Sequence, residues 1–259
     1  MYERFIACHS NSLGENLMKK LFVITTALVG IATATSASAA DMAVRPYTKA
    51  PPMIAAINDW SGFYLGINGG YGSSRNCWTL VNGPTEGCHN ATGGTIGGQF
   101  GYRWQMNSVV FGLEAQGNWA DLTGNNISPV FAPDRNRTKL NAFGLFTGQI
   151  GYSFGDTLIY AKGGAAVTDT KYEIFSGVIN SVLATTTVHK WGATVGAGVE
   201  YAFAPGWSVG FEYDHLFMGN TNVPFRGAVF TQTDTIKQDV DLFTARLNYR
   251  FGGPVVAKY

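Results

Sequence analysis

The sequence predicts an all-β protein: an eight-stranded antiparallel up-and-down transmembrane β-barrel with short periplasmic turns and four long extracellular loops. Three observations predict this class. Eight segments of about ten residues alternate apolar and polar side chains, aromatic residues gather near the segment ends, and a secretion signal precedes them all. Alternate residues of a strand point to opposite faces, so each segment has one apolar face and one polar face.

The N-terminal region divides into three parts before the first strand. Residues 1–17 are polar and partly acidic, unlike an export signal, and we interpret them as a misassigned N-terminal extension. Residues 18–39 resemble a signal peptide, with two lysines, an apolar run and a small-residue cleavage site at Ala37-Ser38-Ala39. The apolar run is too short for a transmembrane helix. Residues 40–58, which contain three prolines and do not alternate, are expected to form a periplasmic linker.

The barrel is predicted over residues 59–251, followed by a C-terminal tail over residues 252–259. Its strands are expected at about residues 60–74, 92–106, 109–120, 138–152, 157–168, 188–203, 207–217 and 239–251. The intervening segments alternate between long and short. The long ones, 75–91, 121–137, 169–187 and 218–238, are expected to be extracellular loops, because bacterial barrels place their short turns in the periplasm. Both chain ends then lie in the periplasm.

One parity of each predicted strand is apolar and is expected to face lipid. It is represented, in strand order, by Phe63, Phe100, Leu113, Ile150, Ile159, Val195, Phe211 and Leu247. The fourth strand is the exception, since Phe143 and Leu145 fall on its inward parity. A soluble lipocalin-like barrel is the alternative architecture, but it would hide its apolar face inside. Here the aromatic residues and the charges lie on opposite parities, which favours the membrane barrel.

Composition excludes several classes of function. Of 18 basic and 17 acidic residues, residues 1–39 hold three and two, which leaves 15 of each in the mature chain. A chain without net charge does not resemble a nucleic-acid-binding protein. Charged residues make up only 14% of the sequence, against about 25% in ordinary soluble domains. Low charge without a spanning apolar helix is typical of a barrel whose exterior faces lipid.

The inward parity carries eight charged side chains. They are four acids and four bases: Arg103, Glu114, Lys162, Glu200, Glu212, Asp214, Arg246 and Arg250. The interior of an eight-stranded barrel is only wide enough to be filled by side chains. Buried charges must therefore pair, and we interpret this set as a salt-bridged plug. A narrow polar path for small solutes is the alternative.

Two cysteines remain in the mature chain, Cys77 and Cys88, and we expect them to form a disulfide because the chain is exported. A metal site would need more ligands than the adjacent His89 provides, so no metal or cofactor is expected. Catalysis is not expected either. The remaining candidates are His189 and His215, and neighbouring strand residues such as Asp214 and His215 point to opposite faces.

The predicted surface segments could bind partners. Arg135, Arg137 and Lys139 lie near the outer end of the fourth strand and are candidates for contact with lipopolysaccharide phosphates. Their alternative role is simple solvation. Loops of this length could also capture a host or environmental ligand.

Three motifs carry a resemblance to a known family. Asp59-Trp60-Ser61-Gly62-Phe63-Tyr64-Leu65-Gly66, residues 158–166 (LIYAKGGAA) and Leu247-Asn248-Tyr249-Arg250-Phe251 resemble the alphaproteobacterial outer-membrane proteins of the Omp25/Omp31 type, part of an opacity-like, porin-like group. The resemblance covers about residues 40–251. It implies an integral protein of the Gram-negative cell outer membrane, surrounded by lipid and lipopolysaccharide and folded by the barrel-assembly machinery. That machinery commonly reads a C-terminal aromatic residue, for which Phe251 and Tyr259 are both candidates.

The function expected from these features is structural and interfacial. The barrel would occupy and stabilise the envelope and present its outer segments to the surroundings. A small passive porin is one alternative, and a loop-mediated receptor or adhesin is another.

Overall fold

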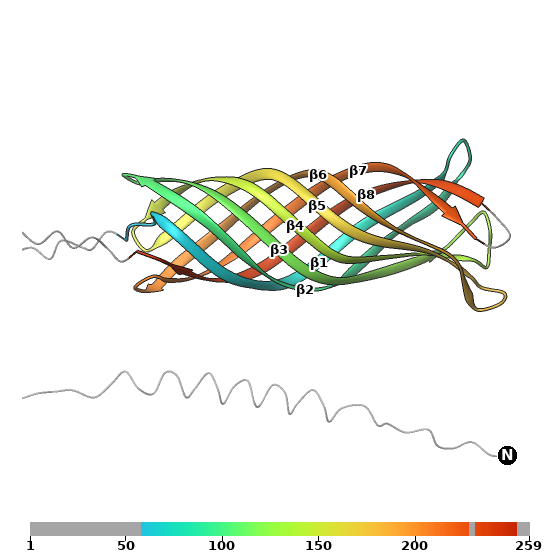
Figure 1. The fold of residues 1–259 in the computed structure, drawn as a ribbon, viewed down its shortest axis with the longest axis horizontal. Coiled ribbons are helices and arrows are strands. Elements are labelled where there is room, and N and C mark those ends of the chain that lie inside the picture. Colours follow the sequence, from blue (N-terminus) through green and yellow to red (C-terminus); the bar gives the residue numbers. More distant parts are fainter. Residues whose placement is uncertain (1–57, 228–230, 253–259) are drawn as a thin grey trace, which may run out of the picture. The chain divides into compact units, whose positions relative to one another are not determined.

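A computed structural model describes residues 58–227 and 231–252 of the chain. Eight antiparallel strands close into one barrel in chain order (Figure 1). They are β1 (Gly62–Leu80), β2 (Thr85–Met106), β3 (Val109–Ile127), β4 (Arg135–Phe154), β5 (Thr157–Ser176), β6 (Ser181–Ala204), β7 (Trp207–Arg226) and β8 (Thr231–Arg250). The predicted fold class is confirmed. The described residues contain no helix long and apolar enough to cross a membrane.

The predicted long loops are wrong in extent. The strands continue through most of 75–91, 121–137, 169–187 and 218–238, which leaves connections of only 81–84, 128–134, 177–180 and 227–230. Asparagine, glycine and proline in these segments resemble a loop composition, but cross-strand pairing overrides that local preference. At the other end, two-residue turns at 107–108, 155–156 and 205–206 confirm the short periplasmic connections. The predicted extracellular loops are therefore a strand-built extension of the barrel.

The predicted signal peptide, the predicted N-terminal extension and nearly all of the predicted linker lie outside the described residues, as does the tail beyond Gly252. Phe251 directly follows β8 at the periplasmic end, and its backbone N–H donates to the carbonyl of Phe63. Tyr259 lies outside the described part of the chain.

The outer wall carries the apolar residues and the inner face carries the polar ones. Phe63, Leu65 and Ile67 alternate with the buried Tyr64 and Asn68. A ring of exposed aromatic side chains marks the outer edge of this apolar band, formed by Tyr71, Trp119, Trp191, Phe217 and Phe243. Such rings lie at the level of lipid headgroups. The strands continue beyond the ring into the extracellular extension.

The interior is layered, and β8 passes through every layer. From the periplasmic end its buried residues are Asn248, Arg246, Thr244, Leu242, Val240, Gln238, Ile236 and Asp234. Leu242 and Val240 belong to one apolar cluster, and Ile236 belongs to a second. The sequence-based expectation of a polar interior is incomplete, because two apolar layers lie on the extracellular side of the charges. The inward parity of Phe143 and Leu145 places them in the first apolar layer.

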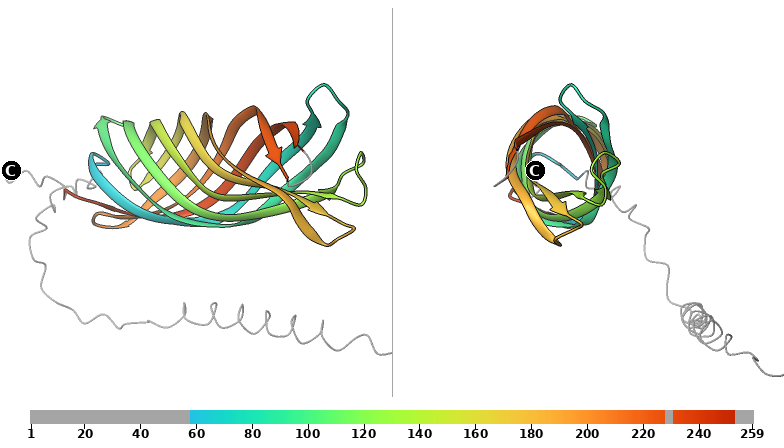
Figure 2. Two further views of the ribbon diagram at one scale, coloured as in Figure 1. Left: turned by 45° about the vertical axis from the view of Figure 1, so that its right-hand side comes forward. Right: turned by 90° about the vertical axis from the view of Figure 1, so that its right-hand side faces the viewer.

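Backbone pairing is not continuous around the extension. The β6–β7 ladder ends at Ala193↔Phe217, although β6 continues to Ser181 and β7 continues to Arg226, and all these residues are described. The β2–β3 ladder likewise ends at Thr92↔Thr123. The extension therefore consists of two four-stranded sheets, β3–β6 and β7–β8–β1–β2. The hairpin tips spread apart at this end (Figure 2). We call the unpaired boundary between 181–192 and 218–226 the β6–β7 seam.

Glycines let neighbouring strands approach closely, and one pair of positions tests this. A Cβ atom at Gly97 would overlap the Gly117 carbonyl oxygen and lie 2.7 Å from the Asn118 Cα. A Cβ at Gly117 would meet nothing within 4 Å. We expect Gly97→Ala to lower the free energy of unfolding by about 1–3 kcal/mol through overpacking, and Gly117→Ala to leave it nearly unchanged. Urea titration of both variants in lipid vesicles measures this; equal losses would contradict the packing argument.

Candidate functional site

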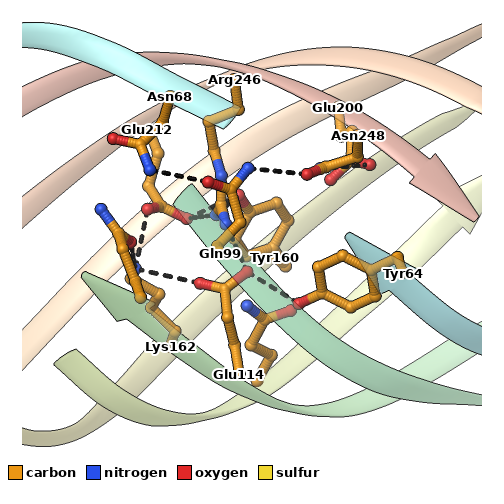
Figure 3. Close-up of polar contacts among 12 residues, drawn as sticks. Tyr64, Asn68, Gln99, Glu114, Tyr160, Lys162, Glu200, Glu212, Arg246 and Asn248 are labelled. Atoms are coloured by element: carbon orange, nitrogen blue, oxygen red, sulfur yellow. Dashed lines mark hydrogen bonds and ion pairs between the residues drawn. The ribbon is translucent and has the colours of Figure 1, made fainter. Parts of the chain in front are cut away.

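The centre of the barrel holds a network of charged side chains, of which Figure 3 labels Glu114, Lys162, Glu200, Glu212 and Arg246. With Arg103 on β2, the network draws on six strands. Arg246 on β8 lies at its middle and forms ion pairs with Glu114 on β3 and Glu212 on β7. Two tyrosines complete these pairs. The hydroxyl of Tyr64 donates to Glu114 at 2.7 Å, and that of Tyr160 donates to Glu212 at 2.7 Å. Each carboxylate thus receives a guanidinium and a phenol.

Lys162 on β5 joins the same two acids to a third. Its Nζ lies 2.7 Å from Glu212, 3.6 Å from Glu114 and 3.2 Å from Asp214. Strand alternation explains the arrangement, because Glu212 and Asp214 are two residues apart on β7 and therefore point to the same side. One ammonium bridges three carboxylates, which ties β3, β5 and β7 together across the lumen.

A second ion pair lies nearer the periplasm. Arg103 on β2 contacts Glu200 on β6 at 2.8 Å, and its guanidinium carbon lies 4.4 Å from the centre of the Tyr64 ring. Asn248 donates to the other oxygen of Glu200 at 3.0 Å. Arg250, predicted as part of the same set, is only half-buried and donates to Asn58 at 3.0 Å. Seven of the eight predicted interior charges are therefore in the network, and Arg250 lies at the periplasmic rim.

These side chains are almost completely buried. Every partner in the interior ion pairs is at most 3% exposed. The adjacent apolar layer is equally dry, since Leu122, Leu140, Leu145 and Leu216 are all fully buried. The charged layer is thus buried on all sides and is covered by an apolar layer on its extracellular side. Removing one partner of such a buried ion pair is strongly destabilising, because it leaves the other charge buried without compensation.

The remaining predicted residues lie in the extension or on the outer wall. Cys77 and Cys88 face each other across β1 and β2 as a disulfide, with Cα atoms 4.0 Å apart. His89 is buried within the extension, between Asn126 at 2.7 Å and Thr138 at 3.0 Å. The remaining histidine candidates lie on the outer wall and pair across strands, His215 with Asp241 at 2.7 Å and His189 with Asp169 at 3.4 Å.

The candidates for lipopolysaccharide contact are spread along β4. Lys139 lies just beyond the aromatic ring and pairs with Asp121 at 3.1 Å. Arg137 lies 3.7 Å from Glu173, and Arg135 is exposed at the end of the strand. Only Lys139 is therefore near headgroup level, and the contact stays a prediction. We expect Lys139→Glu to weaken association with lipopolysaccharide; an unchanged amount bound to the purified protein would contradict it.

Sequence reasoning missed the polar residues of the extension. Glu86 and Asp234 lie in segments predicted as loops, yet both are buried, at 1% and 0% exposure. A signal existed for Asp234, because even-numbered residues from 234 to 248 all face inward on β8. No comparable signal identified Glu86, since Gly87 and the bulge between Trp78 and Thr79 interrupt the alternation of its hairpin.

Comparison with known proteins agrees with this architecture. Residues 25–251 match the outer membrane protein beta-barrel domain family. The chain belongs to this family. It is 32% identical over 234 residues to the 31 kDa outer-membrane immunogenic protein of Brucella melitensis, covering 84% of this chain and 95% of the relative, and it matches the Brucella suis protein of that name equally well. The resemblance to the Omp25/Omp31 type is thereby confirmed, as is localisation in the cell outer membrane.

Solved structures show similar folds at low sequence identity. OprG, an outer membrane protein from Pseudomonas aeruginosa, is 11% identical, with a TM-score of 0.44 over 74% of this chain and 97% of OprG. Neisserial surface protein A is 14% identical, with a TM-score of 0.37 over 74% and 98% of the two chains.

Proposed function

We propose that this outer-membrane β-barrel protein is a closed structural element of the envelope that presents its extracellular extension to the surroundings. The dry ionic network carries the proposal. Arg103, Lys162 and Arg246 are paired with acids from opposite walls, so a solute would have to separate buried ion pairs to pass. Removing one partner of such a pair costs about 3–5 kcal/mol, which opposes a standing water path.

Conductance of the mature protein, residues 40–259, in planar bilayers tests this proposal. A gel shift between unboiled and boiled samples first establishes that the barrel is folded. We expect a silent membrane. Steady openings that change when Glu114 or Arg246 is replaced would make the protein a small porin and overturn the closed-barrel proposal.

The proposal includes no catalytic role and no cofactor. Both outer-wall histidine–aspartate pairs, His215–Asp241 and His189–Asp169, lie near the aromatic ring on the lipid-facing side of the barrel. Such a position suits contact with polar headgroups. Folding by the barrel-assembly machinery, with Phe251 as the aromatic residue that it reads, belongs to the same proposal, since Phe251 continues directly from β8.

A further inference from the structure

A cavity of about 530 Å³ opens at the extracellular mouth of the barrel, above the second apolar cluster. Its walls are of two kinds. Leu80, Phe131 and Leu183 supply apolar surface, whereas Glu86, Asn136 and Gln232 supply polar atoms. The volume falls in the range of about 300–1,000 Å³ that is typical of small-molecule sites, and a mixture of apolar wall and a few polar groups is usual there.

The polar wall holds one buried carboxylate, Glu86, which shares an amide with a second, Asp234, that is fully buried outside the lining. Glu86 accepts hydrogen bonds from Asn136 at 2.7 Å and from Gln232 at 3.1 Å. The same Gln232 nitrogen donates to both oxygens of Asp234, at 2.9 and 3.0 Å. Among the described residues, no basic nitrogen lies within the 4.0 Å ion-pair distance of either carboxylate. This contrasts with the barrel centre, where each acid has a basic partner.

Burial without a cation is unfavourable for a carboxylate, and its effect is visible in both acids. Burial raises the pKa of Glu86 above its usual value and raises the pKa of Asp234 to about 6. Other titratable groups around them are Asp134, which lines the cavity, His89 on β2 and Tyr172 on β5. None of these supplies a positive charge at neutral pH, because burial also lowers the pKa of His89.

We propose that this cavity binds an amphipathic cation, with an amine or guanidinium at Glu86 and an apolar body against Leu80, Phe131 and Leu183. Asp234, linked to Glu86 through Gln232, adds negative charge from behind the wall. The unpaired negative charge favours a positively charged ligand. The apolar wall favours a ligand with an apolar body over a bare ion. A metal ion is a poorer match, since no group of three or more metal-ligating side chains exists among the described residues. The proposal is independent of whether the barrel conducts.

Dansylcadaverine, a naphthalene dye with a primary amine on a five-carbon chain, is a suitable probe. Its fluorescence shifts to shorter wavelength in an apolar site, and its size suits the cavity. Two matched dyes provide the comparison: N-pentyl dansylamide, which lacks the amine, and N-dansyl-6-aminohexanoic acid, which carries the opposite charge. We expect saturable binding of the amine to the folded wild-type protein at pH 7.5, at least tenfold tighter than either matched dye.

Neutral variants locate the site. We expect Glu86→Gln and Asp234→Asn each to weaken binding of the amine about tenfold or more, and to leave the weak binding of N-pentyl dansylamide unchanged. Asp121→Asn is the matched control, because it removes a carboxylate that is 75% exposed on the outer wall. Equal affinity of the three dyes, or unchanged affinity in both cavity variants, would overturn the proposal.

The wild-type protein also provides a test that needs no substitution. Lowering the pH from 7.5 to 5 protonates Asp234, whose pKa is about 6, while the amine of the probe stays charged. Affinity should therefore fall several-fold at pH 5. An affinity that is unchanged or higher at pH 5 contradicts the proposal, even if a cavity variant fails to fold.

Discussion

Arg246→Ala is expected to lower the free energy of unfolding by about 3–5 kcal/mol. The guanidinium is the shared partner of Glu114 and Glu212, and both carboxylates are at most 1% exposed. Without it, the two buried acids lose their guanidinium partner and share only Lys162 with Asp214. Lys162 stays 2.7 Å from Glu212, but it already serves Asp214 as well. Urea titration in lipid vesicles, followed by tryptophan fluorescence, measures the loss.

Arg250→Ala is the matched control for this prediction. Arg250 is on the same strand and the same face, four residues away, but it is half-buried and donates to Asn58 at the rim. Its removal should cost less than about 1 kcal/mol, as for an exposed polar contact. Adding Glu114→Gln and Glu212→Gln to Arg246→Ala should recover part of the loss, because the unpaired charges disappear. Equal midpoints for Arg246→Ala and Arg250→Ala would show that the centre is hydrated and the plug is open.

The membrane-embedded part of the barrel was predictable because strand alternation is its dominant constraint. A lipid-facing wall must be apolar, so apolar residues such as Phe211 and Phe243 are predicted to point outward. Glu212 follows Phe211 directly and is therefore predicted to point inward. Alternation places the interior charges on one face but cannot pair them. Pairing depends on register and barrel closure, which bring Arg246 on the last strand opposite Glu114 on the third.

The extension was not predictable in the same way. Outside the membrane the outer wall can be polar, so the contrast between the two faces fades, and segments such as 218–238 read as loops. Inward residues Val223 and Phe225 keep the alternation there. Because these segments were predicted as loops, the sequence did not indicate that Glu86 and Asp234 lie close together. They share Gln232 only because both segments form paired strands.

The extension has fewer backbone hydrogen bonds between its strands than the membrane part. Its stability therefore depends more strongly on side-chain packing. Across the β6–β7 seam the described residues place side-chain bonds from Thr186 to the Pro224 carbonyl at 2.9 Å and from Lys190 to the Gly219 carbonyl at 3.1 Å. The second apolar cluster contains residues from both sides of the seam, Ala184 on β6 and Phe225 on β7. Packing therefore replaces the ladder as the force that holds the two sheets together.

Trp78 is the centre of that cluster, and Trp78→Ala should release the extension while the membrane part stays folded. The indole is fully buried, stacked on Phe225 at 5.3 Å and edge-on to Tyr172 at 5.6 Å. Truncation of a buried tryptophan costs about 3–5 kcal/mol. Because no β6–β7 ladder exists at this height, the loss should lower the free energy of local opening of the extension. Trypsin, which cleaves after the exposed Arg226, should then cut much faster than in the wild-type protein.

Trp119→Ala separates this effect from the general loss of a tryptophan. Trp119 is 76% exposed in the aromatic ring at the membrane edge and lies outside the cluster. Its removal should leave the rate of cleavage in the extension unchanged. In Trp78→Ala the gel shift between unboiled and boiled samples should persist, because the ionic network and the first apolar layer are untouched. If Trp78→Ala were cleaved no faster than Trp119→Ala, the two sheets would be held by something other than this cluster. The β6–β7 seam would then stay closed without the packing of Trp78.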